Sequence, residues 1–307
     1  MMDAAVVDKL GDAPRPGRVE VPVPRAGQVA VEVCAAALNP VDLLISGGRH
    51  PVGAPPVPHV PGVEGVGRLV DGARVWFSVH GGFVSGSLGR YTAVPDAACV
   101  PVPDDLSDPV AAAIGVVGTG ALVALRDRAA LRGGERVLVL GATGAFGQMF
   151  VQVAKVLGAG HVTAAGRDGE RLAGLVSIGA DELVGLDDLD GAAGAGYDVV
   201  VDPLWGPYAG PGLRLLADGG RLLNVGQAAG AVAELSAGPL RHRGVSVIGF
   251  SGAGVAPAPA AAAYREVAAA VVAGRIVVDV ATYPLAEVAT AWRAQAASPG
   301  RKLVVTM

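Results

Sequence analysis

The chain has 307 residues, of which 51% are hydrophobic and 17% are charged, and its net charge at neutral pH is −4. This composition supports a large buried core and excludes an intrinsically disordered protein. The basic residues are scattered rather than gathered in a patch, so no nucleic-acid partner is expected. A length above about 250 residues favours two domains over one.

The N-terminal stretch carries Asp3, Asp8 and Lys9 where the apolar core of a signal peptide would lie. No uncharged apolar run reaches the length of about 18 residues that is needed to span a membrane. Two cysteines, Cys34 and Cys99, lie in strand-like apolar runs and are expected to be buried, reduced thiols. We therefore expect a soluble, cytoplasmic protein without a membrane partner.

Residues 1–110 are predicted to form short strands separated by prolines and glycines, with no long helical period. The strand-like runs are GRVEVPVP, QVAVEVCAAAL, GVGRLV, ARVWFSV, RYTAVP and ACVPVP. This pattern predicts an all-β module with a barrel-like arrangement. A helical period begins near residue 107, where Ser107 or Asp108 can cap the helix and Pro109 suits its first turn.

Strand-like and helical runs then alternate. Strands are predicted at 137–140, 161–165, 198–202, 221–225 and 245–250, and helices at 146–157, 170–178 and 208–216. This alternation predicts a parallel sheet with right-handed crossovers. The remaining chain predicts an Ala-rich helix at 258–273, a strand within 275–284, a helix at 285–296 and a last strand at 302–307. Because the strand-like character of this tail resembles the first module, the tail is expected to return to it.

A glycine-rich loop, GATGAFG, occupies residues 141–147 between a predicted strand and a predicted helix. A tight turn, a close approach of the backbone to a diphosphate and close helix–strand packing each require glycine in such a loop. Because the following helix also offers free N–H groups, the loop predicts a dinucleotide site, with a purely structural turn as the alternative. The predicted contact residues are Gly141, Ala142, Thr143, Gly144, Ala145, Phe146 and Gly147.

Arg167 stands twenty positions after Gly147, at the end of the second predicted parallel strand. An acidic residue there would accept a hydrogen bond from the adenosine 2′-hydroxyl, whereas an arginine can pair with a 2′-phosphate. Gly166 leaves room for the guanidinium. We therefore expect NADPH as the cofactor. The alternative is that Arg167 is solvated and that Asp168 takes the ribose of NAD.

The whole chain resembles the zinc-independent branch of the medium-chain dehydrogenase/reductase superfamily, the quinone oxidoreductase-like or enoyl reductase-like proteins. The matching stretches include VEVCAAALNPVDLLISGG, PHVPGVEGVGRLV, VLVLGATGAFGQMFVQVAKVLGA, DGGRLLNVG, LRHRGVSVIGF and GRKLVV. The resemblance implies an α/β fold. A GroES-like β-barrel substrate domain would comprise residues 1–110 and 275–307, and a Rossmann nucleotide-binding domain would comprise residues 111–274.

The resemblance also implies that no zinc is bound. Zinc-dependent relatives carry a cysteine where Asn39 stands and a histidine where Val63 stands, and a catalytic zinc needs three protein ligands. Two cysteines cannot fill a four-cysteine structural zinc site. Without a Lewis acid, the expected acceptors are already electrophilic, such as quinones and α,β-unsaturated carbonyl compounds. The expected reaction is NADPH-dependent hydride transfer to such a compound.

Four residues are catalytic candidates. The resemblance places Asn39 near the nicotinamide, where its amide could donate a hydrogen bond, although it could also simply tie a turn. Thr119 matches a family position where a hydroxyl approaches the nicotinamide, with a helix-interior threonine as the alternative. Tyr91 and His50 could donate a proton, against core packing for the tyrosine and plain solvation for the histidine. Asp42 is expected to cap a helix.

Further cofactor contacts are implied at strand ends, because ligands bind at the carboxyl edge of such sheets. These residues are Leu204, Val225, Gly226, Phe250 and Ser251, together with Lys302, for which a surface charge is the alternative. The apolar, weakly charged first module suggests a small apolar carbonyl-containing substrate. The family commonly pairs subunits through the strand at 245–250, so we expect a homodimer.

A second function remains open from the sequence. The family often carries a tyrosine after the segment NPVD, whereas this chain continues Leu43, Leu44, Ile45, and no acid for protonation is evident. A redox-neutral or non-catalytic nucleotide-binding protein of the same fold, such as a cyclase-like natural-product tailoring protein, would explain both features.

Overall fold

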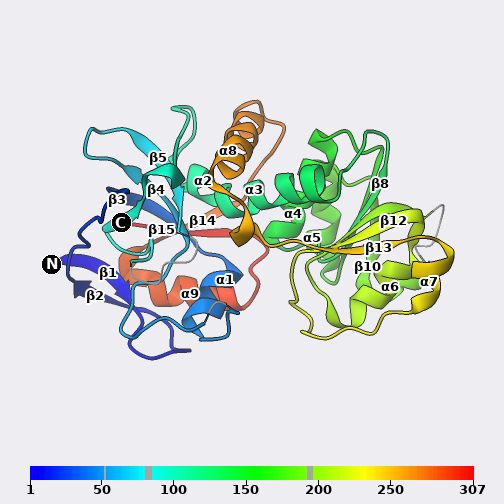
Figure 1. Ribbon diagram of the computed structural model, residues 1–307, viewed down its shortest axis with the longest axis horizontal. Coiled ribbons are helices and arrows are strands. Elements are labelled where there is room, and N and C mark those ends of the chain that lie inside the picture. The colour runs from blue at the N-terminus through cyan, green and yellow to red at the C-terminus, as the bar shows by residue number, and fades with distance from the viewer. Residues whose placement is uncertain (52, 80–84, 192–195) are drawn as a thin grey trace. The chain divides into compact units, whose positions relative to one another are not determined.

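The computed structural model describes residues 1–51, 53–79, 85–191 and 196–307. The loop residue His80, which like His50 is a histidine of the first module that could donate a proton, lies outside the described residues. The chain divides into two units (Figure 1). The first comprises Met1–Val116, Val255–Val272 and Val278–Met307, and the second comprises Val117–Gly254 and Ala273–Val277. Within the described ranges, every helix is too short or too polar to cross a membrane.

The first unit is built on β-strands, as its turn-rich sequence predicts. Strand β1 (Met2–Val6) pairs antiparallel with β2 (Arg15–Val19). The larger sheet has the order β14-β15-β3-β4-β5-β7, and β6 pairs with β3. Its strands are β3 (Gln28–Ala37), β4 (Glu64–Arg68), β5 (Arg74–Ser78), β6 (Tyr91–Pro95), β7 (Cys99–Pro101), β14 (Val280–Pro284) and β15 (Lys302–Thr306). Figure 1 shows β15, near the C-terminus, beside β3 from the N-terminal part, so the tail completes this sheet.

The helices of the first unit are α1 (Pro40–Ser46), α2 (Asp108–Ala113), α8 (Pro257–Val272) and α9 (Val288–Ala296). Helix α9 buries Val288, Ala291 and Trp292, which share one helical face because they stand three and four residues apart. These side chains pack into the same core as Phe77 of β5 and Val305 of β15. The core therefore joins segments from both ends of the chain.

Helix α8 belongs to the first unit, whereas residues 258–273 were predicted to lie in the nucleotide-binding domain. Its Tyr264 is fully buried and stacks on Trp76, with ring centroids 4.5 Å apart and an interplanar angle of 6°. The Tyr264 hydroxyl donates a hydrogen bond to the carbonyl oxygen of Ala111 at 3.0 Å. This anchoring depends on contacts between residues distant in sequence, which the Ala-rich helical pattern does not reveal.

The second unit holds the predicted parallel sheet, in the order β10-β9-β8-β11-β12-β13. All its neighbouring strands run parallel. The strands are β8 (Arg136–Val139), β9 (His161–Gly166), β10 (Glu182–Gly185), β11 (Tyr197–Asp202), β12 (Leu216–Asn224) and β13 (Ser246–Gly249). The helices are α3 (Gly115–Val123), which crosses the boundary between the units, α4 (Ala145–Val156), α5 (Gly169–Gly174), α6 (Ala209–Arg214) and α7 (Ala237–His242).

The strands at the centre of this sheet are continuous apolar runs because both of their faces are buried. Val137, Leu138 and Val139 of β8 are fully buried, as are Phe150 and Val153 of α4. Three short elements, β1, β10 and α7, were not predicted, because four to six residues give too little periodicity to recognise. The helix predicted at 208–216 ends at Arg214, and β12 begins at residue 216, earlier than predicted.

Candidate nucleotide-binding and active-site residues

The glycine loop of the second unit leaves β8 and leads into α4 by a turn that only glycine fits. Gly141 has a φ of +60°, which favours glycine. A Cβ at Gly147 would lie 2.4 Å from the carbonyl oxygen of Gly141 and 2.6 Å from Cα of Ala142. The Ala142 N–H donates to the carbonyl oxygen of Ala165 at 2.9 Å, which ties the loop to β9. The loop backbone is therefore held close to the start of the helix.

Helix α4 begins at Ala145, and its N-cap residue, Gly144, supplies no side-chain hydrogen bond to the first turn. The first N–H groups of a helix lack intrahelical acceptors and carry a partial positive charge. The loop is also tied to α4 itself, because the Gln148 side-chain amide donates a hydrogen bond to the Thr143 carbonyl oxygen at 3.1 Å. Without an acidic residue in its first turn, this helix end fits the diphosphate of a dinucleotide.

The carboxyl end of β9 places Gly166 against the glycine loop and leaves Arg167 exposed. A Cβ at Gly166 would lie 2.7 Å from Cγ2 of Thr143, so the glycine makes room for that side chain. The neighbouring Asp168 caps α5, accepts a hydrogen bond from the Arg171 N–H at 3.1 Å and pairs with the Arg171 guanidinium at 3.2 Å. Asp168, the alternative candidate for binding the adenosine ribose, is thus already bound to the first turn of α5 and to Arg171.

The ends of β11 and β12 lie beside the glycine loop. A Cβ at Gly141 would lie 3.0 Å from Cδ2 of Leu204, so this leucine, predicted as a contact, packs on the loop. The buried Asp202 accepts from the Leu204 N–H at 2.9 Å through Oδ1, and its backbone oxygen accepts from the Val225 N–H at 2.9 Å. Both predicted residues are thereby fixed at one sheet edge.

Strands β12 and β13 also end at this sheet edge. The side-chain amide of Asn224 donates to the carbonyl oxygen of Gly226 at 2.7 Å, and its backbone oxygen accepts from the Phe250 N–H at 2.9 Å. Ser251 follows as an exposed residue. The structure therefore brings the loop residues, Leu204, Val225, Gly226 and Phe250 to the carboxyl edge of one sheet.

In the first unit, three buried polar side chains from separate segments meet. The Lys302 ammonium donates to Oδ1 of Asn39 at 2.7 Å and lies 3.5 Å from Oε1 of Glu64. The Asn39 amide donates to the same Oε1 at 2.8 Å. Their exposed fractions are 2% for Asn39, 0% for Glu64 and 3% for Lys302, so Lys302 is not a surface charge. Glu64 was not among the predicted site residues, and its only sequence signal was the GVE segment.

Asp42 caps α1, as expected, because its Oδ2 accepts the backbone N–H of Asn39 at 2.7 Å. Burial raises the pKa of Asp42 to about 7, and Glu64 adds to this rise, against the lowering effects of the Asn39 N–H and Lys302. Its Oδ1 has no hydrogen-bond partner among the described residues and lines a cavity of about 40 Å³. His59 also lines this cavity, with its Nδ1 unpartnered within the described part of the chain.

Replacing Asp42 by Asn is expected to change how stability depends on pH. A buried carboxyl with a raised pKa binds its proton more tightly in the folded state than in the unfolded state. Its contribution to the free energy of unfolding is therefore present below about pH 4 and is lost as the pH rises to about 7. Asparagine does not ionise, so the variant does not lose this stability. Urea unfolding should therefore show the variant gaining on the order of a few kcal/mol relative to wild type between these pH values. A difference that does not vary with pH would contradict the buried-carboxyl account.

The other catalytic candidates lie apart from this cluster in the sequence and take different environments. Thr119 is 9% exposed inside α3, in the second unit. His50 is half-buried in the turn that follows α1, where its carbonyl oxygen accepts from the Gly53 N–H at 3.0 Å. Tyr91 starts β6 and donates its hydroxyl hydrogen to Oε1 of Glu32 at 3.3 Å.

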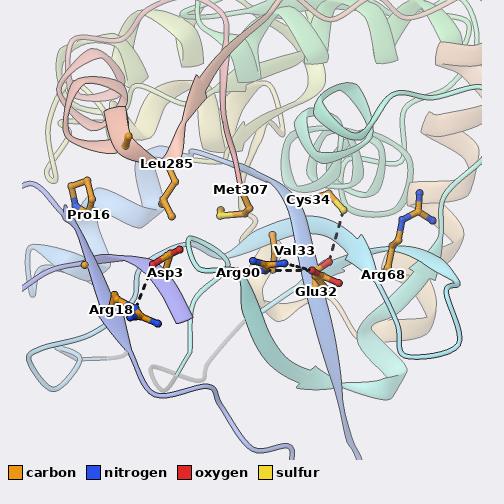
Figure 2. A pocket seen from close by; sticks show the side chains of 12 residues that line it. Asp3, Pro16, Arg18, Glu32, Val33, Cys34, Arg68, Arg90, Leu285 and Met307 are labelled. Carbon is orange, nitrogen blue, oxygen red and sulfur yellow. Dashed lines mark hydrogen bonds and ion pairs between the residues drawn. The ribbon is translucent and has the colours of Figure 1, made fainter. Parts of the chain in front are cut away.

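Glu32 lines a cavity of about 930 Å³ in the first unit (Figure 2). Its carboxylate pairs with the Arg90 guanidinium at 3.2 Å. A second ion pair, between Arg18 and Asp3 at 3.7 Å, also lines this cavity. None of the predicted catalytic residues is among the lining residues. Most of its charges are satisfied by one another, so this cavity offers no arrangement for hydride transfer.

Two family models match the chain: "Alcohol dehydrogenase GroES-like domain" over residues 25–104 and "Zinc-binding dehydrogenase" over residues 145–272. The chain is 32% identical over 256 residues to the quinone oxidoreductase of Rattus norvegicus, which covers 76% of this chain and 74% of that protein. A quinone oxidoreductase from Thermus thermophilus, whose structures include a complex with NADPH, matches with a TM-score of 0.83 and 32% identity over 100% of both chains.

Polyketide synthase proteins also match. The chain is 35% identical over 322 residues to the spectinabilin polyketide synthase system protein NorB of Streptomyces orinoci, which covers 98% of this chain and 14% of that protein. The chain likewise spans 10% of the length of a phenolphthiocerol/phthiocerol polyketide synthase of Mycobacterium tuberculosis, to which it is 37% identical over 220 residues. The similarity therefore concerns one region of those much longer proteins.

Proposed function

Because this chain belongs to the medium-chain dehydrogenase/reductase superfamily, among its quinone oxidoreductase-like members, we propose that it is an NADPH-dependent reductase that needs no zinc. The acceptor would be a quinone or an α,β-unsaturated carbonyl compound. The coarser features are established: the protein is an oxidoreductase with a GroES-like domain and a Rossmann-like parallel sheet, and its cofactor is a nicotinamide nucleotide.

The main support for NADPH rather than NADH comes from the residues at the carboxyl end of β9. Arg167 is exposed there, and its guanidinium has no hydrogen-bond or ion-pair partner within the described ranges. Asp168, the acid next to it in the chain, is used as the N-cap of α5 and as the partner of Arg171. A free guanidinium next to an occupied carboxylate favours a 2′-phosphate over a 2′-hydroxyl.

The glycine loop fits the rest of the nucleotide. Gly147 leaves no space for a Cβ, and the φ of +60° at Gly141 favours glycine, so backbone atoms form the surface beside the start of α4. The free N–H groups of the first helical turn would hold the diphosphate. Leu204, Val225, Gly226, Phe250 and Ser251 would then border the remainder of the cofactor along the sheet edge, as the resemblance implies.

Zinc does not fit the polar cluster of the first unit. The donors there are an amide, one carboxylate and an ammonium, rather than three ligands of the cysteine, histidine and carboxylate type. The Lys302 ammonium already lies between Asn39 and Glu64, and a second cation would be repelled by it. Among the described residues, no group of three or more metal-binding side chains occurs. We therefore derive no step through a metal.

When bound, the reduced nicotinamide supplies a hydride to the acceptor. The chain's own contribution is to hold the cofactor at the sheet edge and to stabilise the negative charge that develops on the acceptor oxygen. Asn39 is the proposed donor to that oxygen. One of its amide hydrogens is held by Glu64, whereas the other meets the Ala37 carbonyl oxygen at the longer distance of 3.3 Å and can be shared with an acceptor. The proposed hydroxyl at the nicotinamide end is that of Thr119.

The acceptor class follows from the poor fit of the polar cluster to a metal and from the relatives. A compound without Lewis-acid activation must already be electrophilic, which suits quinones and enones. The named relatives are quinone oxidoreductases and polyketide synthase proteins. An apolar substrate, including an enoyl thioester, agrees with the low charge of the chain.

A homodimer is part of the proposal. Strand β13 forms one edge of the six-stranded sheet, with β12 as its neighbour on the inner side. An edge strand presents unpaired backbone N–H and C=O groups, which a second copy could pair. Sedimentation at several protein concentrations would measure the oligomeric state.

The proposed activity predicts NADPH consumption by protein that has been treated with a chelator. The acceptor panel is 1,4-benzoquinone, 1,4-naphthoquinone, trans-2-hexenal and crotonyl-CoA, and NADPH absorbance is followed. Turnover with at least one acceptor, unchanged by the chelator, is expected. Tight NADPH binding without turnover of any acceptor would instead favour the redox-neutral alternative, and activity restored only by zinc would contradict the metal-free mechanism.

A further inference from the structure

We propose that Lys302 is a positioning residue whose buried ammonium fixes and polarises the amide of Asn39. This inference rests on the proposed function, because it assigns how Asn39 is prepared to donate to the acceptor oxygen. The family resemblance implies that Lys302 contacts the cofactor. The structure instead directs its ammonium to Leu38, Asn39 and Glu64, within the first unit.

The hydrogen bonds of the cluster allow only one orientation of the amide. The ammonium has only donors, and it donates to Oδ1 of Asn39 at 2.7 Å and to the Leu38 carbonyl oxygen at 3.1 Å. The amide nitrogen faces two acceptors, Oε1 of Glu64 at 2.8 Å and the Ala37 carbonyl oxygen at 3.3 Å. A flipped amide would turn its NH₂ group against the ammonium and its oxygen against the carboxylate. The charges on both sides therefore lock the amide.

Hydrogen bonds to its second carboxylate oxygen, Oε2, hold Glu64 in place. Oε2 accepts the Val116 N–H at 2.6 Å and the Trp76 indole N–H at 3.2 Å. A Cβ at Gly115 would lie 2.1 Å from this oxygen, so the chain leaves space for the carboxylate there. Hydrogen-bond donors therefore meet both oxygens of this buried carboxyl group. The acceptor for the amide is consequently held rigidly in place.

The chain topology explains how Lys302 reaches this place. Lys302 is the first residue of β15, which runs antiparallel to β3, and the Leu38 N–H donates to the Leu303 carbonyl oxygen at 2.8 Å. Asn39, two residues beyond the end of β3, is the N-cap of α1. The strand pairing therefore brings the start of the last strand to the start of the first helix, although the two residues are far apart in sequence.

Burying an ion pair is costly, and an apolar residue of similar volume would often be as stable. Burial lowers the pKa of Lys302, whereas Glu64 and Asp42, the two carboxyl groups that face it, raise it. A hydrogen bond from an ammonium to the amide oxygen polarises the amide and strengthens its N–H groups as donors. The weakly held N–H toward Ala37 is then the one available to an acceptor oxygen.

The inference is tested first without any substrate. The chain has two asparagines, Asn39 and Asn224, so selective ¹⁵N-asparagine labelling gives two side-chain amides in an NMR spectrum. In Lys302→Met, both Asn39 amide signals should shift, and their hydrogen exchange should accelerate by roughly tenfold or more, since about 1.4 kcal/mol of lost interaction corresponds to a factor of ten. The Asn224 signals should stay in place. Unchanged Asn39 signals would overturn the proposal.

Wild-type protein provides a variant-free measurement in case Lys302→Met fails to fold. Raising the pH until Lys302 loses its proton should move the Asn39 side-chain signals and leave those of Asn224 unchanged, and Asn39 signals insensitive to this titration would overturn the proposal. Lys155→Met is the matched control. It removes the other lysine that pairs with a carboxylate, that of Asp181 at 2.5 Å, and should leave the Asn39 signals unchanged.

A kinetic measurement separates positioning from cofactor contact. With NADPH and 1,4-naphthoquinone, Lys302→Met should lower kcat by roughly 10²-fold while the Kd for NADPH stays within about twofold. A weakened Kd with unchanged Asn39 signals would instead support direct cofactor contact and would overturn the proposal, as would an unchanged kcat. If wild type turns over no acceptor, the proposed function fails, but the NMR result still decides whether Lys302 holds the amide.

Discussion

A Gly147→Ala variant is expected to lose nucleotide binding. The added Cβ would lie 2.4 Å from the carbonyl oxygen of Gly141 and 2.6 Å from Cα of Ala142. Both are backbone atoms, which cannot rotate away as a flexible side chain could. The loop must therefore shift away from the start of α4, and the backbone surface for the diphosphate is lost. We expect the Kd for NADPH to rise by roughly 10²-fold or more, which corresponds to about 3 kcal/mol.

The measurement is a fluorescence titration with NADPH, accompanied by thermal unfolding of the free protein. Gly174→Ala in α5 is the control, because a Cβ at that position meets no atom within 4 Å. It should bind NADPH as wild type does and be as stable or slightly more stable. Unaltered NADPH affinity in a folded Gly147→Ala protein would show that the loop does not bind the diphosphate.

The second large effect is expected for Arg167→Asp, which should reverse the cofactor preference. Losing a charge-assisted hydrogen-bond pair and placing a carboxylate near the 2′-phosphate should raise the Kd for NADPH by roughly 10²-fold. The new carboxylate can accept hydrogen bonds from the ribose hydroxyls of NADH, so the affinity for NADH should rise. Titrations of both nucleotides against both proteins give the four dissociation constants.

Arg241→Asp in α7 is the charge control for this substitution. It changes the net charge by the same amount but lies outside the glycine loop and the end of β9. Its two dissociation constants should match those of wild type. If Arg167→Asp leaves the preference for NADPH intact, the 2′-phosphate is recognised elsewhere and the argument from the end of β9 fails.

The nucleotide-binding unit could be predicted well because its signals are local. A strand, a glycine loop and an amphipathic helix follow one another within residues 136–156, and each has its own period or its own steric requirement. Parallel strands end at one edge, so residues after β11, β12 and β13 could be assigned to that edge in advance. The contact between Gly166 and Thr143 was not foreseen, because it joins the end of β9 to the glycine loop across the sheet edge.

The polar cluster of the first unit could be predicted only in part. Asn39 and Lys302 were each singled out, but for separate roles, and Glu64 was missed as a site residue. Their meeting depends on the pairing of β15 with β3 and on the position of Glu64 at the start of β4, and no local pattern encodes either. The placement of α8 in the first unit was missed for the same reason, because the contact between Tyr264 and Trp76 is long-range.

The most direct test of the central claim is a paired titration of NADPH and NADH against wild-type protein that has been treated with a chelator. The exposed Arg167 and the engaged Asp168 predict that NADPH binds tighter by roughly 10²-fold, with no change when zinc is supplied. Equal or tighter binding of NADH, or binding of either nucleotide only when zinc is present, would contradict an NADPH-dependent, metal-free reductase.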